Sequence, residues 1–191
     1  TAGLDGGGIY LGSGNMTVTN STISGNSANR DGGGVFYLNG TLTFNNVNIT
    51  NNMADNDFPT NNVGDGGGIA EGSSISTGSI RVINSIIAGN IDKDNGDNGN
   101  GIFAPDCYSN ISIGLVRSLL GNAQNGYGQN FCSFASTSSI FGGIIGGGIF
   151  EAVSPIDPKL AALANNGGFG RTHALQEGSP AIDRGSPETQ G

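Results

Sequence analysis

The sequence predicts an all-β fold, a triangular parallel β-solenoid, from three observations. The motif Asp-Gly-Gly-Gly followed by an apolar residue occurs three times, beginning at Asp5, Asp31 and Asp65. Each copy is followed by the same succession of short segments in which apolar and polar residues alternate, which is the pattern of half-buried strands. No segment except residues 158–164 shows a helical period. Repeats of this kind predict stacked units that bury one continuous core.

The first expected strand of each unit follows the glycines directly, at residues 9–11, 35–37 and 69–71. Glycine suits the turn before this strand, because it lets the backbone turn sharply and pass close to a neighbouring rung. We expect each aspartate to accept hydrogen bonds from the N–H groups of its own glycine turn, as in Asx turns. A stacked row of aspartates then has a structural rather than a catalytic role.

Two further segments follow in each unit, always in the same order. Alternating strands are expected at residues 16–19, 42–45 and 80–83. Segments of the type Asn-Ser-Thr-Ile-Ser-Gly-Asn come next, in three copies and a worn fourth: residues 20–26, 46–52, 84–90 and 118–122. Each unit therefore holds three short strands, and a single unit cannot bury its own apolar face.

Stacking the units places Ile23 over Ile49 over Ile87 in a continuous core. Two sets of asparagines should stack likewise, because Asn tolerates left-handed bends and its amide can bond to the copies above and below. These sets are Asn20, Asn46 and Asn84, and Asn26, Asn52 and Asn90. A β-sandwich also suits strands at this spacing. We favour the solenoid because sandwich strands need not resemble one another, whereas these do.

Extra residues and the C-terminal part complete the expected architecture. The second and third motifs lie further apart than the first and second, so residues 56–64 are expected to form a loop inserted at a corner. Residues 92–100 are expected to form another. Residues 158–164 indicate a short helix or turn within a short irregular or helical C-terminal cap. Residues 1–191 are treated as a single domain.

Charge and composition exclude some classes of function. The net charge is −8 and there are only seven Lys and Arg, which argues against a nucleic-acid-binding protein. The acidity most simply serves solubility. No apolar run reaches membrane-spanning length, and no signal peptide is recognisable because Thr1 lies within the repeat pattern. We therefore expect a processed chain or a fragment of a longer one.

Cys107 and Cys132 are the only cysteines. Two cysteines without a CxxC motif or a histidine cluster argue against zinc, and a disulfide is the preferred interpretation. In the chain-entropy model, a bridge of this span stabilises by roughly 3–4 kcal/mol. A disulfide also indicates a location outside the cytosol.

The repeats, typified by Gly-Gly-Gly-Ile and Asn-Ser-Thr-Ile-Ser-Gly-Asn, resemble those of polymorphic outer-membrane proteins and adhesin-like passengers, which are bacterial right-handed parallel β-helix surface proteins. A series of motifs in the back half is similar to the choice-of-anchor Q domain family. The motifs are residues 106–107, 119–122, 157–160, 165–168, 172–175 and 178–183. Departures are Phe169-Gly170, where the family usually shows Pro-Thr, and Ser118, where Asn is common.

The repeat resemblance covers residues 5–122, within a repeat region of residues 1–122, and the family signature covers residues 105–185 of a choice-of-anchor Q-like part at residues 105–191. The resemblance implies a right-handed β-helix, secretion, and a cell-surface or extracellular location. The family name implies an anchoring signal after the domain, and none is recognisable before Gly191. It implies no known reaction.

A calcium site is one candidate, formed by Asp92, Asp94 and Asp97. Carboxylates and amide oxygens at alternating positions suit Ca²⁺, which takes six to eight oxygen ligands. The EF-hand spacing fails, however, because Phe103 stands where a bidentate glutamate is needed. A solvated acidic corner loop is the simpler interpretation, and no other cofactor is expected.

A catalytic site is not expected. His173 is the only histidine, and we interpret it as a hydrogen-bonded residue of the cap. Parallel β-helix folds do host polysaccharide lyases and hydrolases, which need paired carboxylates or a basic residue with a cation. The arginines show no common register along the sequence: they are Arg30, Arg81, Arg117, Arg171 and Arg184.

Five Asn-x-Ser/Thr sequons are candidates for glycosylation, provided that the host has the machinery. They are Asn15, Asn20, Asn39, Asn48 and Asn110. An Asn- and Thr-rich chain also produces such triplets by chance.

The favoured hypothesis is a secreted, non-catalytic structural or adhesin-like protein of the cell surface. The first alternative is a filament subunit that binds itself head to tail through open solenoid ends, with the apolar run at residues 140–150 as a further strand or plug. The second is a carbohydrate-binding or polysaccharide-degrading β-helix that uses corner loops such as residues 55–64. The expected partners are accordingly the chain itself, a host or neighbouring cell surface, or a carbohydrate.

Overall fold

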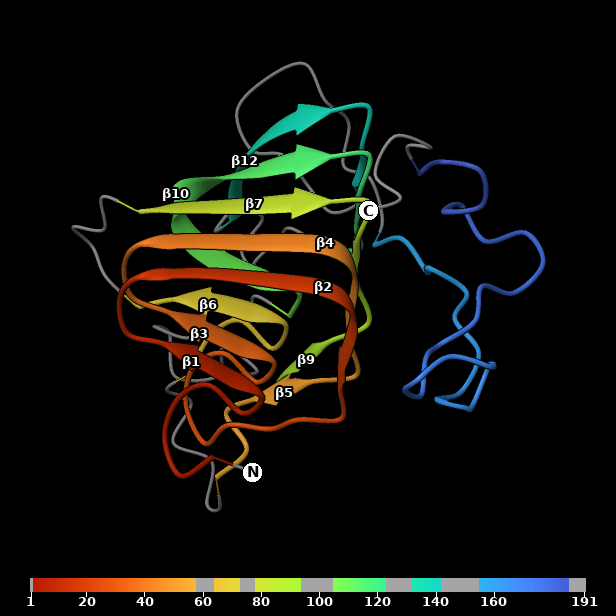
Figure 1. The fold of residues 1–191 in the computed structure, drawn as a ribbon. Coiled ribbons are helices and arrows are strands. Elements are labelled where there is room, and N and C mark those ends of the chain that lie inside the picture. Colours follow the sequence, from red (N-terminus) through yellow and green to blue (C-terminus); the bar gives the residue numbers. More distant parts are fainter. Residues whose placement is uncertain are drawn as a thin grey trace.

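The computed structural model describes residues 2–57, 64–72, 78–93, 105–122, 132–141 and 155–185. These residues form thirteen β-strands and no helix. Eleven of the strands join one sheet, and neighbours in it are distant in sequence, because each strand pairs in parallel with its counterpart in the next rung. The chain is an all-β protein with the parallel solenoid that the sequence predicts (Figure 1).

The first face of the solenoid carries the strands that follow the glycine turns. It consists of β1 (Ile9–Leu11), β3 (Val35–Tyr37), β6 (Ile69–Glu71) and the start of β10 (Cys107–Val116). They pair in this order, one per rung. The fourth rung lacks the Asp-Gly-Gly-Gly motif but keeps its strand.

The second face has the longest strands, and these lie side by side in Figure 1. It consists of β2 (Asn15–Ser24), β4 (Thr41–Thr50), β7 (Ser79–Ile83), the second half of β10, and β12 (Cys132–Thr137). All four pairs along it are parallel. Five rungs are therefore stacked on this face.

The third face begins where the chain bends at the end of the second. It consists of the ends of β2 and β4, then β8 (Ile86–Ile87), β11 (Leu119–Leu120) and β13 (Ile140–Phe141). A small separate pair, β5 (Met53–Ala54) with β9 (Ile91–Asp92), follows this face.

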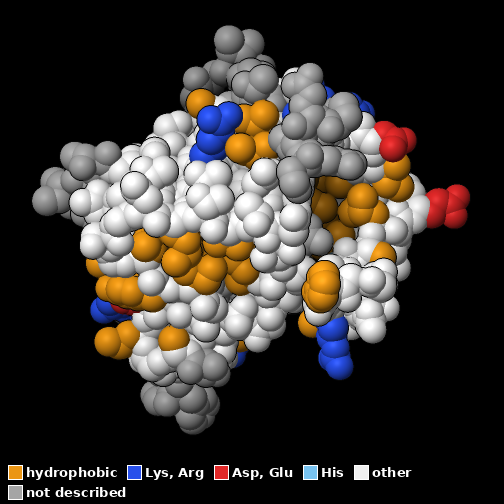
Figure 2. All heavy atoms as spheres, viewed as in Figure 1, with side chains coloured by type: hydrophobic (Ala, Val, Ile, Leu, Met, Phe, Trp, Pro, Cys, Tyr) orange, Lys and Arg blue, Asp and Glu red, His pale blue; other side chains and the backbone are white. Residues whose placement is uncertain are grey.

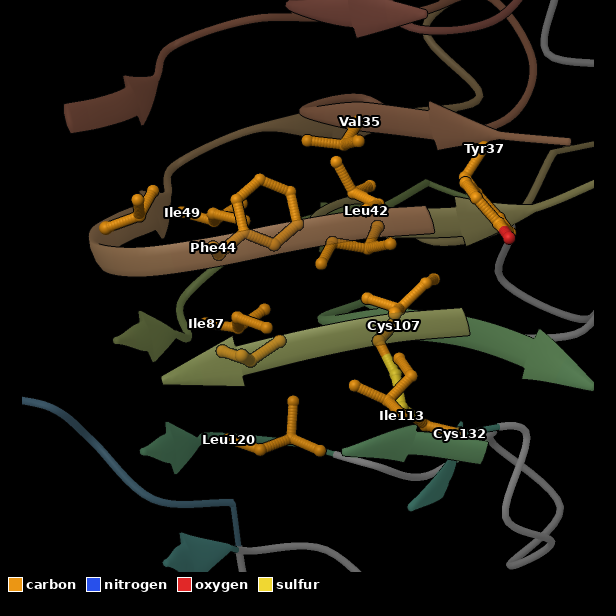
Figure 3. Close-up of a cluster of buried hydrophobic side chains, with 14 of the residues drawn as sticks. Val35, Tyr37, Leu42, Phe44, Ile49, Ile87, Cys107, Ile113, Leu120 and Cys132 are labelled. Atoms are coloured by element: carbon orange, nitrogen blue, oxygen red, sulfur yellow. A yellow bond between two sulfur atoms is a disulfide. The ribbon is translucent and has the colours of Figure 1, made fainter. Parts of the chain in front are cut away.

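Apolar side chains stack in columns inside the solenoid. Ile23 pairs in register with Ile49, Ile49 with Ile87, and Ile87 with Leu120, so the predicted isoleucine column is confirmed and extended by one rung. Figure 3 shows the column from Ile49 to Leu120 beside the ring of Phe44. Full burial of such a side chain stabilises by about 1.5–3 kcal/mol, so the columns hold the rungs together.

A buried row of amides, the internal asparagine ladder, runs parallel to the core. The Nδ2 atom of Asn26 donates to Oδ1 of Asn52 at 2.9 Å, and Nδ2 of Asn52 donates to Oδ1 of Asn90 at 3.0 Å. This predicted stack is confirmed. In the fourth rung the ladder ends on Asp106, whose Oδ1 accepts from Nδ2 of Asn90 at 2.9 Å.

The sequence does not reveal why Asp106 takes this place. Cys107 is level with Ile69, so Asp106 is level with Gly68. A Cβ atom on Gly68 would lie 2.7 Å from Nδ2 of Asn90, because this position faces the ladder. The aspartate side chain therefore enters the ladder, and Asn122 contributes its backbone N–H to Oδ2 of Asp106 at 2.7 Å.

The aspartates of the glycine turns bond differently from the expectation. The backbone N–H of Asp31 donates to Oδ1 of Asp5 at 3.3 Å, and that of Asp65 donates to Oδ1 of Asp31 at 2.9 Å. In the first two turns the glycine N–H groups donate instead to carbonyl groups of the next rung. The Asx-turn prediction is wrong for these two turns, because stacking already satisfies their glycine N–H groups. Arg30 pairs with Asp5 at 2.6 Å and with Asp31 at 3.4 Å, which reduces repulsion within the row.

One disulfide joins the fourth rung to the fifth. It links Cys107, the first residue of β10, to Cys132, the first residue of β12, with Cα atoms 5.6 Å apart. Both cysteines are buried in the core (Figure 3). The predicted pairing is confirmed.

Residues 155–185, the C-terminal segment, run along the outside of the solenoid (Figure 1). Two isolated antiparallel bridges, Leu160 with Leu175 and Ala164 with Thr172, hold it in a hairpin-like form. No helix forms at residues 158–164, because Lys159 has φ of 48°, which no right-handed helix accepts. Across all the residues that the structure describes, no helix is long and apolar enough to cross a bilayer.

Candidate functional site: a groove beside the third face

A groove with a volume of 630 Å³ lies between the third face and the C-terminal segment. Its described lining residues are Asn20, Asn46, Asn48, Asn84, Ser85, Ile86, Arg117, Ser118, Leu119, Ser138, Ile140, His173, Leu175, Ala181, Arg184 and Gly185. They come from five successive rungs on one side and from the C-terminal segment on the other. Figure 2 shows hydrophobic side chains gathered where the C-terminal segment meets the solenoid.

The solenoid wall of the groove is a row of residues at the bend between the second and third faces. This corner row consists of Asn20, Asn46, Asn84, Arg117 and Ser138. All five have positive φ, between 46° and 56°, a conformation that Asn tolerates better than other non-glycine residues. Because parallel strands lie about 4.8 Å apart, the row is about 19 Å long.

The sequence identified three members of the corner row and missed two. The worn fourth copy is recognisable in the sequence only from Ser118 onward. The backbone N–H of Ser85 donates to Oγ of Ser118 at 3.2 Å, so these two serines are level. Arg117 therefore occupies the asparagine position of the fourth rung. Ser138 occupies it in the fifth, because Val116 is paired with Thr137.

A row of serine hydroxyls fixes the backbone directly behind the corner row. Oγ of Ser85 accepts from the backbone N–H of Val47 at 2.9 Å, and Oγ of Ser139 accepts from that of Ser118 at 3.1 Å. Oγ of Ser85 and of Ser118 also donate to carbonyl groups of the preceding strands, at 2.6 Å and 2.9 Å. The corner is therefore held rigidly, and the corner side chains start from a preorganised backbone.

His173 fastens the opposite wall to the solenoid. Its Nδ1 lies 2.7 Å from the carbonyl oxygen of Ala161 and its Nε2 lies 2.9 Å from Oγ of Ser24. A carbonyl only accepts, so Nδ1 carries a proton in this arrangement, and Nε2 forms a hydrogen bond with the Ser24 hydroxyl. The side chain is buried, with 6% exposure. The interpretation of His173 as a hydrogen-bonded structural residue is confirmed.

Apolar contacts complete the attachment of the C-terminal segment. Ile86, Ala88 and Leu119 of the solenoid form a small hydrophobic cluster, and Ile156, Leu160 and Ala181 of the C-terminal segment pack against it with Ile140. Through this contact, Ile86, Leu119, Ile140 and Ala181 give the groove an apolar part of its lining. The rest of the lining is mostly amides and hydroxyls.

The groove is positively charged within an acidic protein. None of its described lining residues is acidic, and two of them, Arg117 and Arg184, are arginines. Both arginines are exposed, and neither forms an ion pair within the described part of the chain. Arg117 belongs to the corner row and Arg184 to the C-terminal segment, so the two share no repeat register, but both line the groove.

The sequence-predicted metal site is only partly described. Asp94 and Asp97 lie outside the described residues, and Asp92 is buried in β9, with 2% exposure. Among the described residues there is no group of three or more His, Cys, Asp or Glu side chains arranged to hold a metal ion. The calcium site stays a prediction.

The predicted sequons fall into two groups. Asn15, Asn39 and Asn110 are exposed on the solenoid. Asn20 and Asn48 line the groove, where Nδ2 of Asn48 also donates to the carbonyl of His173 at 3.5 Å. A glycan on either of these two would occupy the groove.

Asp106, which lies away from the groove, has a strongly perturbed carboxyl group. Burial raises its pKa to about 7, while hydrogen bonds from the backbone N–H and amide of Asn90 and from the backbone N–H of Asn122 act in the opposite direction. Desolvation disfavours the charged form of a carboxyl group. We interpret Asp106 as a structural end of the internal asparagine ladder, because it is fully enclosed and does not line the groove.

Comparison with known proteins adds no relative. No family model, no curated protein and no solved structure matches the chain. The fold and the groove define the class of protein: it is a disulfide-linked, all-β parallel solenoid with a polar groove along one corner.

Proposed function

We propose that this protein is a secreted, non-catalytic, adhesin-like β-solenoid of the cell surface and that the groove is its ligand-binding surface. The observation that carries this proposal is the groove itself. A row of amides and hydroxyls from five rungs, with apolar side chains beside it, can bind a ligand by hydrogen bonds and by contact. Convergent polar groups on a preformed concave surface are typical of binding sites.

Two observations support an extracellular location. The Cys107–Cys132 disulfide is consistent with a protein that folds in an oxidising compartment. The ordered motifs in the back half resemble the choice-of-anchor Q domain family, and the repeats resemble those of polymorphic outer-membrane proteins. We propose on this basis that the chain belongs to the bacterial β-helix surface proteins.

The lining of the groove supports binding rather than hydrolysis. Glycoside hydrolysis ordinarily uses two carboxylates that flank the scissile bond, whereas no described lining residue is Asp or Glu. Both ring nitrogens of His173 are engaged in hydrogen bonds that attach the C-terminal segment. A surface that holds a ligand without cleaving it suits an adhesin-like protein.

A tryptophan placed in the groove tests the proposal, because the chain contains no tryptophan. Leu175 lines the groove and is 42% exposed, while Leu163 in the same segment does not line it and is 40% exposed. Leu175→Trp should report saturable binding from a panel of surface polysaccharides by a change in emission, and Leu163→Trp should not. The panel is also assayed for release of reducing ends. Cleavage contradicts the non-catalytic part of the proposal, and ligands that bind without changing the Leu175→Trp emission contradict the choice of site.

A filament subunit is the second candidate, supported by the open edge of the first rung. No described strand pairs with the outer edge of β1 or β2. Ile9, Met16 and Val18 at this end are only partly buried against the core, and Figure 2 shows hydrophobic side chains at the surface between β2 and β1. Such edges template the addition of another strand. Electron microscopy decides: fibres of constant width support the filament, and dispersed particles at high concentration exclude it.

A further inference from the structure

We infer that the groove binds an acidic polysaccharide, a chain of sugars bearing carboxylate or sulfate groups, with Arg117 and Arg184 contacting the anionic groups. This inference rests on the proposed function and adds the chemical class of the ligand. Three features of the groove support this inference. The groove is positively charged, Arg117 breaks the asparagine pattern of the corner row, and strands β8 and β11 beside the groove have no unpaired edge.

The charge of the groove selects an anionic ligand. The protein has a net charge of −8, yet the described lining contains two arginines and no carboxylate. Arg30, by contrast, is paired with Asp5 and Asp31. Arginine presents a planar fork of donors that matches carboxylate and sulfate-like groups. Asp183 adjoins Arg184 in sequence but does not line the groove, so the groove itself presents positive charge.

Arg117 departs from the residue type that its backbone position favours. Asn20, Asn46 and Asn84 hold the same position in the first three rungs, and all share the positive φ that Asn accommodates. Arg117 has φ of 46° with a longer side chain that gains nothing from this conformation. A residue that breaks a local rule without a local compensation is a candidate for function, and here it faces the groove.

The main chain of β8 and β11 beside the groove leaves no edge for an acidic peptide held by strand addition. Peptides of that kind bind through the unpaired edge of a sheet. Along the third face, β8 pairs with β4 on one side and with β11 on the other, and β11 pairs with β13. The groups on offer are side-chain amides and hydroxyls, which both donate and accept, as sugar hydroxyls require.

The side chains of the groove also exclude single-stranded nucleic acid. Proteins bind such strands with aromatic side chains on which bases stack, together with a strongly basic groove. The described lining contains no Phe, Tyr or Trp, and its only ring is that of the buried His173. The corner row repeats at strand spacing over about 19 Å, which suits an extended chain of sugars lying along the solenoid axis.

Matched ligands and matched variants test the inference. The probes are polyuronate oligomers and their methyl esters, and a sulfated galactan and its desulfated form, so that each pair differs in charge. The variants are Arg117→Asn, which installs the residue of the first three rungs, Arg184→Gln, and the double variant. Arg171→Gln is the control, because Arg171 is an exposed arginine of the C-terminal segment that does not line the groove.

We expect at least one charged probe to bind about tenfold or more tightly than its neutral form, and binding to weaken as salt is raised. Arg117→Asn and Arg184→Gln should each weaken that binding about tenfold, as loss of a charge-assisted contact does, and Arg171→Gln should not. Circular dichroism and the melting temperature check that each variant is folded.

Two results overturn the inference. One is equal binding of the charged and neutral forms, or failure of all charged probes to bind; the other is unchanged affinity in the Arg117→Asn/Arg184→Gln variant. If neutral sugars then change the Leu175→Trp emission, the proposed function survives without this inference. If no panel ligand changes that emission, the proposed function fails as well.

Discussion

Arg117 occupies a bend that three asparagines hold in the preceding rungs. The left-handed conformation costs an ordinary L-residue roughly 1–2 kcal/mol, and Asn less because its short polar side chain bonds locally. The strain at Arg117 therefore has to be offset by the surrounding stack. The same residue supplies one of the two positive charges in the groove.

Replacing Arg117 by Asn should make the protein more stable while weakening its binding of an acidic ligand. We expect the free energy of unfolding to rise by about 0.5 kcal/mol, because Asn relieves strain at this φ. Chemical denaturation measures the change, with Arg171→Gln as a control expected to be neutral. A loss of stability greater than about 1 kcal/mol would show that Arg117 holds the corner together, and would contradict this interpretation of the residue.

At the scale of structural elements, the two asparagine rows differ in burial. Asn52 is 0% exposed, and its side chain accepts from the backbone and amide of Asn26 and donates to Ile23 and Asn90. Asn46 is exposed and donates to Asn20 at 3.2 Å. Buried groups that lose a partner cost more than exposed ones, since water cannot replace the lost bond.

Asn52→Ala should therefore destabilise the solenoid by about 3 kcal/mol, because it leaves donors of Asn26 and an acceptor on Ile23 unsatisfied. Asn46→Ala should cost only about 1 kcal/mol, mostly from the positive φ of the corner. Thermal melting of both variants checks the order. Equal losses would contradict the claim that the internal asparagine ladder is the stronger element.

The carboxyl group of Asp106 makes the internal asparagine ladder sensitive to pH. Its pKa is raised from 3.8 to about 7 by burial. Between these values the folded protein holds a proton that the unfolded chain has released. The contribution of Asp106 to stability is thus fully present below about pH 4 and is lost as the pH rises through 7. This contribution to the free energy of unfolding is on the order of 4 kcal/mol.

Asp106→Asn removes the titrating group and should flatten this dependence, at the cost of one hydrogen bond to the N–H of Asn122. The measurement is the difference in free energy of unfolding between wild type and variant from pH 4 to pH 7. We expect wild type to lose stability relative to the variant as the pH rises. Asp157→Asn, at a residue whose carboxylate caps an exposed turn, is the control; a constant difference between wild type and Asp106→Asn would overturn the prediction.

Features that recur in every repeat could be predicted from the sequence, whereas features formed by residues that break the repeat could not. The isoleucine column and the internal asparagine ladder follow from residues that recur in register, because stacking brings equal positions together. Asp106 replaces a glycine of the pattern. The fourth copy, counted from Arg117 to Asn122, is one residue shorter than the third, from Asn84 to Asn90, so the repeat does not show which residue enters the ladder. Arg117 could not be predicted as a corner residue because it breaks the asparagine pattern of the first three rungs.

At the scale of the whole molecule, the groove depends on contacts between distant parts of the chain. Ser24 and His173 are separated by 149 positions, and their hydrogen bond attaches the C-terminal segment to the first rung. The C-terminal segment has no partner among the repeats in sequence, so periodicity could not place Arg184 in the same groove as Arg117. The sequence alone therefore could not predict that these residues form a groove.

The disulfide stabilises the last described rungs. Cys107 and Cys132 are 25 positions apart, and removing such a link should cost about 3 kcal/mol through the greater freedom of the unfolded chain. We expect a Cys107→Ser/Cys132→Ser variant to melt at a lower temperature than wild type and to be insensitive to reductant. A wild-type melting temperature that does not respond to full reduction would contradict this expectation.

The most direct test of the central claim is a titration of the Leu175→Trp protein with an acidic polysaccharide, followed by tryptophan emission and by calorimetry together. We expect a saturable change in emission with the same midpoint as the heat, and loss of both when Arg117→Asn and Arg184→Gln are added. A saturable heat with unchanged emission would place the ligand elsewhere on the protein and contradict the claim that the groove is its binding surface.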